Sequence, residues 1–161
     1  PRRRGGGGME NEARVFYLDT SAIVKRYVFE RHSEYVVELY DSSLDGDVEL
    51  SFSLWNVGEA LGVFDRYLRR GVLTEEAWRA ARRNFLGETK RLVSLGVLKV
   101  VGVTADLLRE SWRLIEKHHI YQADALQITS ARYVKADILV TADKNLCRVA
   151  GEEGLGVKCL A

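Results

Sequence analysis

Short apolar runs alternate along the chain with longer segments in which apolar residues recur every three or four positions. Four runs rich in strand-forming residues, at residues 15–18, 48–52, 98–103 and 138–140, predict β-strands. A further edge strand is predicted at residues 157–160. Because parallel strands need crossover connections, the helical segments between these runs predict a parallel sheet covered on both faces. We expect one three-layer α/β/α domain with a central parallel sheet of four to five strands.

The predicted helices begin at residues that are good helix caps. Ser53, Thr74 and Thr104 each precede an amphipathic segment. After Ser53, one apolar stripe is expected to face the core, formed by Leu54, Val57, Leu61, Phe64 and Leu68. The other helices are expected at residues 22–27, 33–43, 75–95, 105–118, 121–135 and 144–153.

Residues 1–8 contain three arginines and four glycines and precede the first methionine, Met9. We interpret them as a flexible tail foreign to the native chain, with residues 9–161 as a single folded domain. Without these arginines the chain has 21 basic and 23 acidic side chains, so its net charge is −2 instead of +1. Net charge therefore does not predict nucleic-acid binding, and any basic surface must be local.

No apolar run approaches the ~20 residues that span a bilayer, and no secretory segment precedes the first predicted strand. We therefore expect no membrane association and a cytoplasmic location. Many Arg and Glu residues beside few Asn and Gln favour a thermophilic origin. Cys147 and Cys159 match no zinc or thioredoxin-type motif, and two buried thiols are favoured over a disulfide.

Four acidic residues follow predicted strands or begin predicted helices. Asp19 directly follows the first strand, and Asp143 follows the last clear strand by three residues. Glu59 lies in the second turn of the helix after Ser53, and Asp124 lies in the first turn of its own helix. Ligand sites of open α/β sheets lie beyond the carboxyl ends of the strands. All four acids can therefore face one end of the sheet.

Glu59 points about 170° away from the apolar stripe of its helix. Its helical neighbours Gly58 and Gly62 are small enough to let a ligand approach. Trp55 is near enough to stack on a nucleic-acid base, although packing is its more ordinary role.

Carboxylates gathered at one place repel one another unless some are protonated or a cation neutralises them. A set of oxygen ligands without His or Cys suits Mg²⁺ or Mn²⁺. Such an ion activates water and stabilises the charge that develops during phosphodiester hydrolysis. Each acid alone has an ordinary interpretation, as a helix cap, a charge at a helix N-terminus or a solvated side chain. Their conjunction favours a shared metal site.

Four segments resemble, in the same order, the acidic motifs of PIN-domain nucleases. They are YLDTSA at residues 17–22, NVGEAL at 56–61, ADAL at 123–126 and VTAD at 140–143. The resemblance spans residues 15–160, and within the family it points to the VapC-type toxins of prokaryotic toxin–antitoxin pairs. It implies a site for Mg²⁺ or Mn²⁺ formed by Asp19, Glu59, Asp124 and Asp143. It also implies supporting polar roles for Thr20, Ser21 and Thr141.

The resemblance further implies endonucleolytic cleavage of RNA, a homodimer, and inhibition by a cognate antitoxin protein. The two helices predicted after Ser53 and Thr74 are longer than in the shortest family members. The family's dimer surface and antitoxin groove are therefore not carried over to particular residues here.

A basic stripe is predicted on the helix after Thr74, within about 100° of one face. It is formed by Arg79, Arg82, Arg83 and Lys90. The stripe could bind RNA phosphates, but a solvated face balanced by neighbouring glutamates explains it as well. His118 and His119 end a helix, where a cationic ring is favourable, and we assign them no chemistry.

Two other functions are compatible with parts of the pattern. A haloacid-dehalogenase-like phosphatase also has an Asp after its first strand, but here Ser21 stands where its second Asp would be. A metal-binding module that docks RNA or protein without turnover would need the same acids. Intact acidic motifs favour the nuclease over both.

Overall fold

The computed structural model describes residues 12–161, so the predicted tail at residues 1–8 lies outside the described residues. Five parallel strands form one sheet in the order β3-β2-β1-β4-β5. Their bounds are β1 Arg14–Leu18, β2 Val48–Ser53, β3 Leu98–Val101, β4 Ile138–Thr141 and β5 Val157–Cys159. The predicted strands are all present, and the shortest is the predicted edge strand β5.

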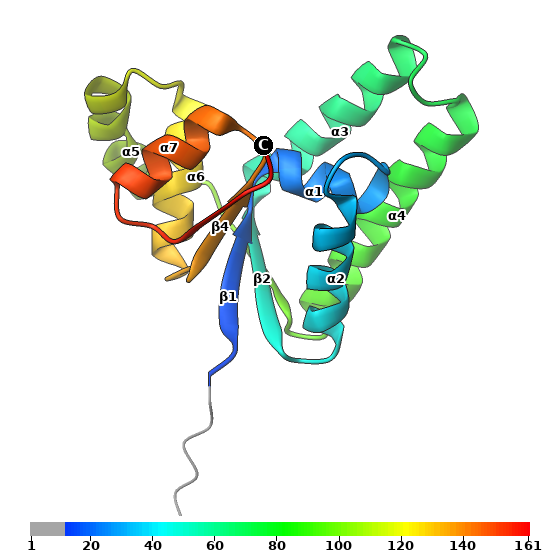
Figure 1. Ribbon diagram of the computed structural model, residues 1–161, viewed down its shortest axis with the longest axis horizontal. Helices are drawn as coiled ribbons and strands as arrows, with labels where there is room; N and C mark the ends of the chain where they lie inside the picture. The colour runs from blue at the N-terminus through cyan, green and yellow to red at the C-terminus, as the bar shows by residue number, and fades with distance from the viewer. Residues whose placement is uncertain (1–11) are drawn as a thin grey trace, which may run out of the picture.

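Helices cover both faces of this sheet, which confirms the predicted three-layer α/β/α fold (Figure 1). One group consists of α1 Thr20–Tyr27, α2 Ser33–Leu44, α3 Leu54–Arg69 and α4 Glu75–Ser94. The other consists of α5 Ala105–His118, α6 Gln122–Tyr133 and α7 Lys144–Glu152. The long helices α3 and α4 form a hairpin that extends away from the sheet. No helix within residues 12–161 has the length and apolar character needed to cross a membrane.

Alternation along β1 divides the core between the two faces of the sheet. Phe16 and Leu18 are buried in the cluster beneath α1 to α4, together with Phe64 and Phe85. Tyr17, between them in sequence, is buried in the opposite cluster beneath α5 to α7. Successive side chains of a strand point to opposite faces, so this central strand serves both halves of the core.

The apolar stripe predicted on α3 is buried at Phe64 but not at its first residue. Leu54 is 57% exposed, whereas the fully buried residues of the helix are Asn56, Ala60 and Phe64. These three are spaced by four positions, and the polar Asn56 and small Ala60 hide this face from a search for large apolar residues. Asn56 is buried and Leu54 is exposed, so the face of α3 that packs on the core differs in part from the predicted one. This face carries a polar side chain, which lies beneath the site described below.

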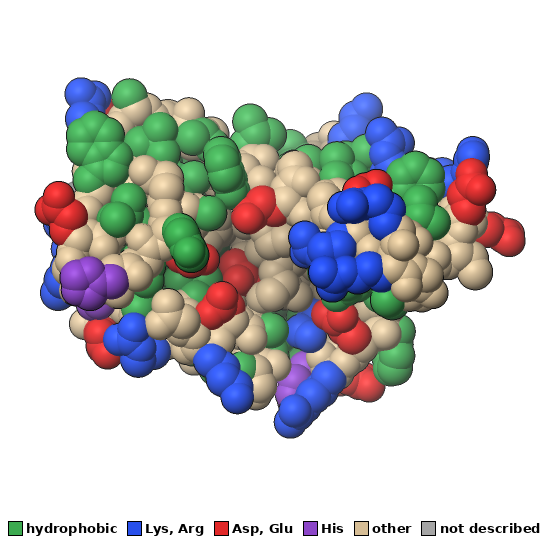
Figure 2. All heavy atoms as spheres, turned by 90° about the horizontal axis from the view of Figure 1, so that it is seen from above, with side chains coloured by type: hydrophobic (Ala, Val, Ile, Leu, Met, Phe, Trp, Pro, Cys, Tyr) green, Lys and Arg blue, Asp and Glu red, His purple; other side chains and the backbone are tan. Residues whose placement is uncertain are grey.

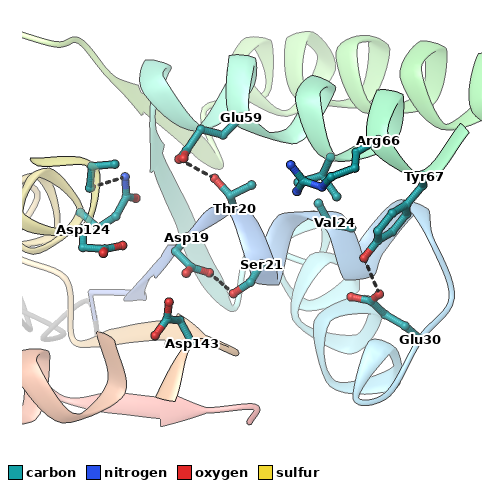
Figure 3. A pocket seen from close by; sticks show the side chains of 13 residues that line it. Asp19, Thr20, Ser21, Val24, Glu30, Glu59, Arg66, Tyr67, Asp124 and Asp143 are labelled. Atoms are coloured by element: carbon teal, nitrogen blue, oxygen red, sulfur yellow. Dashed lines mark hydrogen bonds between the residues drawn. The ribbon is translucent and has the colours of Figure 1, made fainter. Parts of the chain in front are cut away.

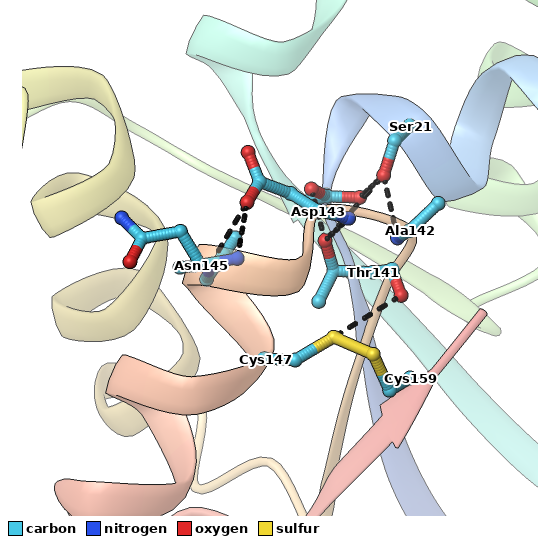
Figure 4. The surroundings of a disulfide bond; sticks show 9 residues. Ser21, Thr141, Ala142, Asp143, Asn145, Cys147 and Cys159 are labelled. Carbon is cyan, nitrogen blue, oxygen red and sulfur yellow. Dashed lines mark hydrogen bonds between the residues drawn. A yellow bond between two sulfur atoms is a disulfide. The ribbon is translucent and has the colours of Figure 1, made fainter. Parts of the chain in front are cut away.

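The cysteines form a disulfide, so the prediction of two buried thiols was wrong. Cys147 lies on α7 and Cys159 at the end of β5, with their Cα atoms 5.7 Å apart (Figure 4). Register explains the pairing, because Cys159 lies beside Thr141 on the neighbouring strand β4. The chain turns into α7 directly after β4, and Cys147 Sγ lies 3.8 Å from the Thr141 carbonyl oxygen. The bond therefore ties α7 to the edge of the sheet.

Candidate active site

A cleft with a volume of about 320 Å³ opens where the strands end and the two groups of helices separate. The lining residues include all four predicted acids, Asp19, Glu59, Asp124 and Asp143. Figure 2 shows a hollow near the middle of the molecule with acidic side chains inside it and Lys and Arg side chains gathered on one rim. The structure thus brings together residues that are up to 124 positions apart in the sequence.

Asp19 is the most buried of these acids, at 6% exposure. One carboxylate oxygen accepts hydrogen bonds from the Ser21 hydroxyl at 2.6 Å and from the Ala22 backbone N–H at 3.0 Å. The other accepts a hydrogen bond of 2.6 Å from the Thr141 hydroxyl. Burial nevertheless raises the Asp19 pKa to about 6, with a further contribution from the charge of Asp143. Asp19 therefore caps α1 and also remains an acid whose ionised form needs a positive neighbour.

Asp143 caps α7 and leaves part of its carboxylate free. Oδ1 accepts hydrogen bonds from the backbone N–H groups of Asn145 at 2.8 Å and Leu146 at 3.0 Å. The backbone N–H of Asp143 donates to the Thr141 hydroxyl at 3.0 Å (Figure 4). The ordinary role of an N-cap and a place in the cleft therefore coexist in one side chain.

Glu59 extends from α3 toward α1, where the Thr20 hydroxyl donates a 2.9 Å hydrogen bond to Oε1 (Figure 3). Thr20 accepts in turn from the buried amide of Asn56, at 3.0 Å. Asn56 also donates to Gln127 Oε1 at 2.9 Å, and the Tyr17 hydroxyl donates to the same oxygen at 2.9 Å. A neutral buried network thus links α1, α3 and α6 beneath the acids and fixes the direction of Glu59.

Asp124 lies in the first turn of α6 and is partly buried. Its pKa is raised, first by burial and then by the negative charges of Asp143 and Glu59. Neighbouring negative charges therefore disfavour the ionised forms of both Asp19 and Asp124. A cation among them would offset both the burial and the repulsion.

The donor set suits a hard divalent cation, because it consists of carboxylate and hydroxyl oxygens without thiolate or imidazole. Within residues 12–161, however, no three Asp, Glu, His or Cys side chains are close enough to ligate one ion. Hydrogen bonds hold Asp19 and Glu59 toward α1, while Asp124 faces them from α6. A bound ion would therefore need water or substrate oxygens to complete its coordination, as Mg²⁺ commonly does.

The three predicted supporting residues all lie at the site. Thr20 contacts Glu59, Ser21 and Thr141 contact Asp19, and the Ser21 hydroxyl also accepts a 2.8 Å hydrogen bond from the Ala142 backbone N–H. Their hydroxyls account for the orientation of two of the four acids.

The predicted RNA-contacting residues lie elsewhere. The cleft lining does not include Arg79, Arg82, Arg83 or Lys90 on α4, or Trp55, which is 45% exposed on α3. Arg79 forms an exposed ion pair of 2.6 Å with Glu75 on its own helix. These residues remain predicted substrate contacts outside the cleft.

Sequence reasoning missed Asn56, Gln127 and Arg66 as residues of the site. Arg66 lies in the last turn of α3, where a cation ordinarily pairs with the helix dipole, but it lines the cleft. Spacing could have found it, because Glu59, Val63 and Arg66 stand at positions i, i+4 and i+7 and share one helix face. Asn56 could have been found as the third residue after the cap Ser53, whose backbone N–H donates to it at 2.8 Å.

Comparisons with known proteins agree with this arrangement. The family model described as PIN domain matches residues 16–152, so the chain belongs to the PIN domain family. Members of this family are nucleases, and the four acids at the strand ends stand on the fold that the family shares. No curated protein sequence matches the chain.

Several solved structures have the same fold at low sequence identity. PAE2754 from Pyrobaculum aerophilum is 20% identical with a TM-score of 0.62, covering 96% of this chain and 92% of that one. VapC20 from Mycobacterium tuberculosis, described as a toxin that cleaves the sarcin–ricin loop, is 19% identical with a TM-score of 0.59, covering 87% and 95%. VapBC2 from Rickettsia felis, bound to a promoter DNA fragment, is 15% identical with a TM-score of 0.58, covering 90% and 98%.

Proposed function

We propose that this PIN-domain protein is an endoribonuclease dependent on Mg²⁺ or Mn²⁺ and is the toxin of a toxin–antitoxin pair. The observation that carries the proposal is the convergence of four carboxylates from four separate segments on one cleft. Two of them, Asp19 and Asp124, have raised pKa values because burial and neighbouring negative charge disfavour their ionised forms. Clustered acids of this kind are typical of functional sites.

Asp19, Glu59, Asp124 and Asp143 are the residues that would hold the ion, at most two of them by direct contact from their present positions and the others through water. When bound, it would activate a water molecule and offset the charge that develops on the phosphate. The chain's own hydroxyls prepare the site, since Ser21 and Thr141 orient Asp19 and Thr20 orients Glu59. The buried amide network beneath them joins α1, α3 and α6 through the hydrogen bonds of Asn56 to Thr20 and Gln127.

The toxin assignment is supported by the kind of proteins that share the fold. VapC20 is a toxin that cleaves RNA, and VapBC2 and a Klebsiella pneumoniae toxin–antitoxin complex have the same architecture. By this analogy the protein acts in the cytoplasm as a homodimer and binds a cognate antitoxin. Coexpression with the product of a small neighbouring reading frame, followed by copurification, tests the antitoxin part.

The activity is tested with purified protein and a mixture of structured and single-stranded RNA. Cleavage is expected with Mg²⁺ or Mn²⁺, and none with EDTA. Asp124→Asn should abolish cleavage without lowering the melting temperature. Asp106→Asn is a matched control, because Asp106 is also a first-turn acid, on α5, but lies outside the cleft.

Two results would contradict the proposal. Cleavage that persists in Asp124→Asn would separate the activity from these acids. Tight RNA binding without cleavage, with either metal and across varied RNAs, would instead indicate a docking module.

A further inference from the structure

The cleft continues beyond the acids to a second end with a different character. That end is lined by Val24 on α1, Glu30 in the loop after it, and Val63, Arg66 and Tyr67 on α3. Figure 3 shows Arg66 directed from α3 along the cleft toward the side where the acids lie. One continuous cleft therefore has carboxylates at one end and a guanidinium at the other.

The charges at this second end are unequally compensated. Glu30 is neutralised by Lys25 Nζ at 3.1 Å, and its other carboxylate oxygen accepts a hydrogen bond of 3.3 Å from the Tyr67 hydroxyl. Arg66 has neither an ion pair nor a side-chain hydrogen bond to any residue within 12–161. Arg69 on the same helix, by contrast, is paired with Asp65 at 2.9 Å. Arg66 thus lies exposed to solvent at the edge of the cleft, with a positive charge that no acid among residues 12–161 pairs with.

The surroundings of Arg66 suit one class of ligand. Val24, Val63 and the ring of Tyr67 form an apolar wall against which a ribose or base can pack. A guanidinium beside such a wall binds the phosphate oxygens of a nucleotide well, often through two parallel hydrogen bonds. Glu59 lies seven residues before Arg66 on the same face of α3. The helix therefore fixes the distance between this end of the cleft and the acidic end.

We propose that this end of the cleft is a nucleotide subsite, in which Arg66 binds an RNA phosphate that flanks the one being cut. The subsite rests on the proposed ribonuclease function and extends it to substrate positioning. The four acids act on the scissile phosphate, while Arg66 and the apolar wall hold the neighbouring nucleotide. Because α3 carries both Glu59 and Arg66, it would determine which phosphate of the RNA strand lies at the acids when the neighbouring phosphate is bound by Arg66.

The test compares Arg66→Ala with Arg70→Ala in cleavage of a short oligoribonucleotide that is cut once. Arg70→Ala removes the same charge from the same end of α3, but Arg70 lies outside the cleft. Arg66→Ala should raise KM about tenfold with little change in kcat, because a charged hydrogen bond to bound substrate is lost. The slope of log KM against log salt concentration should become shallower by about 0.7 for that variant alone.

Combining the protein variant with modified substrates identifies the phosphate that Arg66 contacts. Oligonucleotides with one neutral methylphosphonate linkage at a time are cleaved by the wild type and by Arg66→Ala. At one flanking linkage the wild type should lose about tenfold in kcat/KM, while the variant should lose nothing further, since the same contact is already missing. Equal KM values for Arg66→Ala and Arg70→Ala, or additive losses at every linkage, would overturn the subsite.

The two proposals fail in different ways. A wild type that cleaves no RNA with Mg²⁺ or Mn²⁺ refutes the ribonuclease function and the subsite with it. A wild type that cleaves RNA, with an Arg66→Ala variant that behaves like Arg70→Ala, refutes the subsite alone.

Discussion

The Thr141 hydroxyl donates a 2.6 Å hydrogen bond to the carboxylate of Asp19, 122 residues away in the sequence. The same hydroxyl oxygen accepts a hydrogen bond from the backbone N–H of Asp143 at 3.0 Å. Thr141 is fully buried at the end of β4, next to β1 in the sheet. One side chain therefore sets the positions of two acids that approach the cleft from adjacent strands.

Thr141→Val should weaken both the fold and the activity. Valine keeps the shape but removes the hydroxyl, so Asp19 Oδ2 and the partly buried backbone N–H of Asp143 lose this partner, at a cost of about 2 kcal/mol in the free energy of unfolding. Loss of an orienting bond to a metal-site acid should also reduce kcat at least about tenfold. Thr141→Ser retains the hydroxyl and should recover most of both quantities in urea denaturation and cleavage assays. Equal defects in the Val and Ser variants would show that the methyl group, not the hydrogen bond, matters.

The raised pKa of Asp19 makes the stability of the metal-free protein depend on pH. Asp19 has a pKa of about 6 when folded and 3.8 as an ordinary group, so between these values the folded state retains a proton that the unfolded state has lost. The free energy of unfolding should therefore fall as pH rises from about 4 to 6 and stay low above 6, by about 3 kcal/mol for this group. Asp19→Asn should lack this fall. Thermal melts in EDTA across pH 4–8 measure it, and parallel profiles for both proteins would contradict it.

Added Mg²⁺ or Mn²⁺ should reverse this loss in the wild type. A cation stabilises the ionised carboxylates, so the melting temperature at pH 8 should rise with metal concentration. The rise should disappear in Asp19→Asn and diminish below pH 6, where protons compete with the ion. Equal shifts with Ca²⁺, Mg²⁺ and Mn²⁺ in both proteins would indicate nonspecific binding outside the cleft.

The sequence predicted most helix boundaries because helix caps are local. Thr74 and Thr104 each accept a hydrogen bond from the third following backbone N–H, as their predicted capping role requires. The buried face of α3 was not predictable in this way. Its orientation depends on packing against α1 and α4, which buries Asn56 and Ala60 beside the predicted Phe64 and leaves Leu54 exposed.

The four acids could be found because each stands at a strand end or in the first turns of a helix, where the fold directs side chains to one edge. Arg66 does not stand at a strand end, because it lies near the far end of a sixteen-residue helix, and its spacing from Glu59 is the one sequence signal that points to the cleft. Only the position of α3 beside α1 brings it over the cleft. The disulfide was not predicted for the same reason, because it depends on β5 lying beside β4.

Reduction of the disulfide should destabilise the protein without unfolding it. Closing a loop between residues separated by 12 positions constrains the unfolded chain, which is worth about 3 kcal/mol in the entropic account. Dithiothreitol should lower the wild-type melting temperature toward that of the Cys147→Ser, Cys159→Ser double variant. The double variant should not respond to dithiothreitol, and a response would show that the reagent acts by another route.

A second ionic cluster stabilises the opposite half of the molecule. Glu153, at the end of α7, has a side chain only 4% exposed and contacts Lys117 at 2.7 Å, with Arg113, His118 and Arg132 each at 3.1 Å. Hydrogen bonds from these four side chains hold the Glu153 pKa far below its ordinary value. The cluster joins α5, α6 and α7, the helices on which Asp124 and Asp143 depend.

Glu153→Gln should therefore cost far more stability than an ordinary surface substitution. Glu153 is the acid at the centre of this cluster, and its removal leaves the positive neighbours repelling one another; because Arg113 and Lys117 are more than half exposed, solvent screens part of this repulsion and the cost should be about 2 kcal/mol. Glu152→Gln is the matched control, because the adjacent Glu152 is half exposed and pairs with Arg148 and His118, so its loss should cost less than about 1 kcal/mol. A lowered pKa stabilises the fold above the ordinary value of 4.5 and loses this effect as pH falls below it, so the difference between wild type and Glu153→Gln should shrink in acid. Urea denaturation at pH 7 and pH 3 measures both effects, and equal stabilities of the two Gln variants at pH 7 would show that solvent screens the cluster.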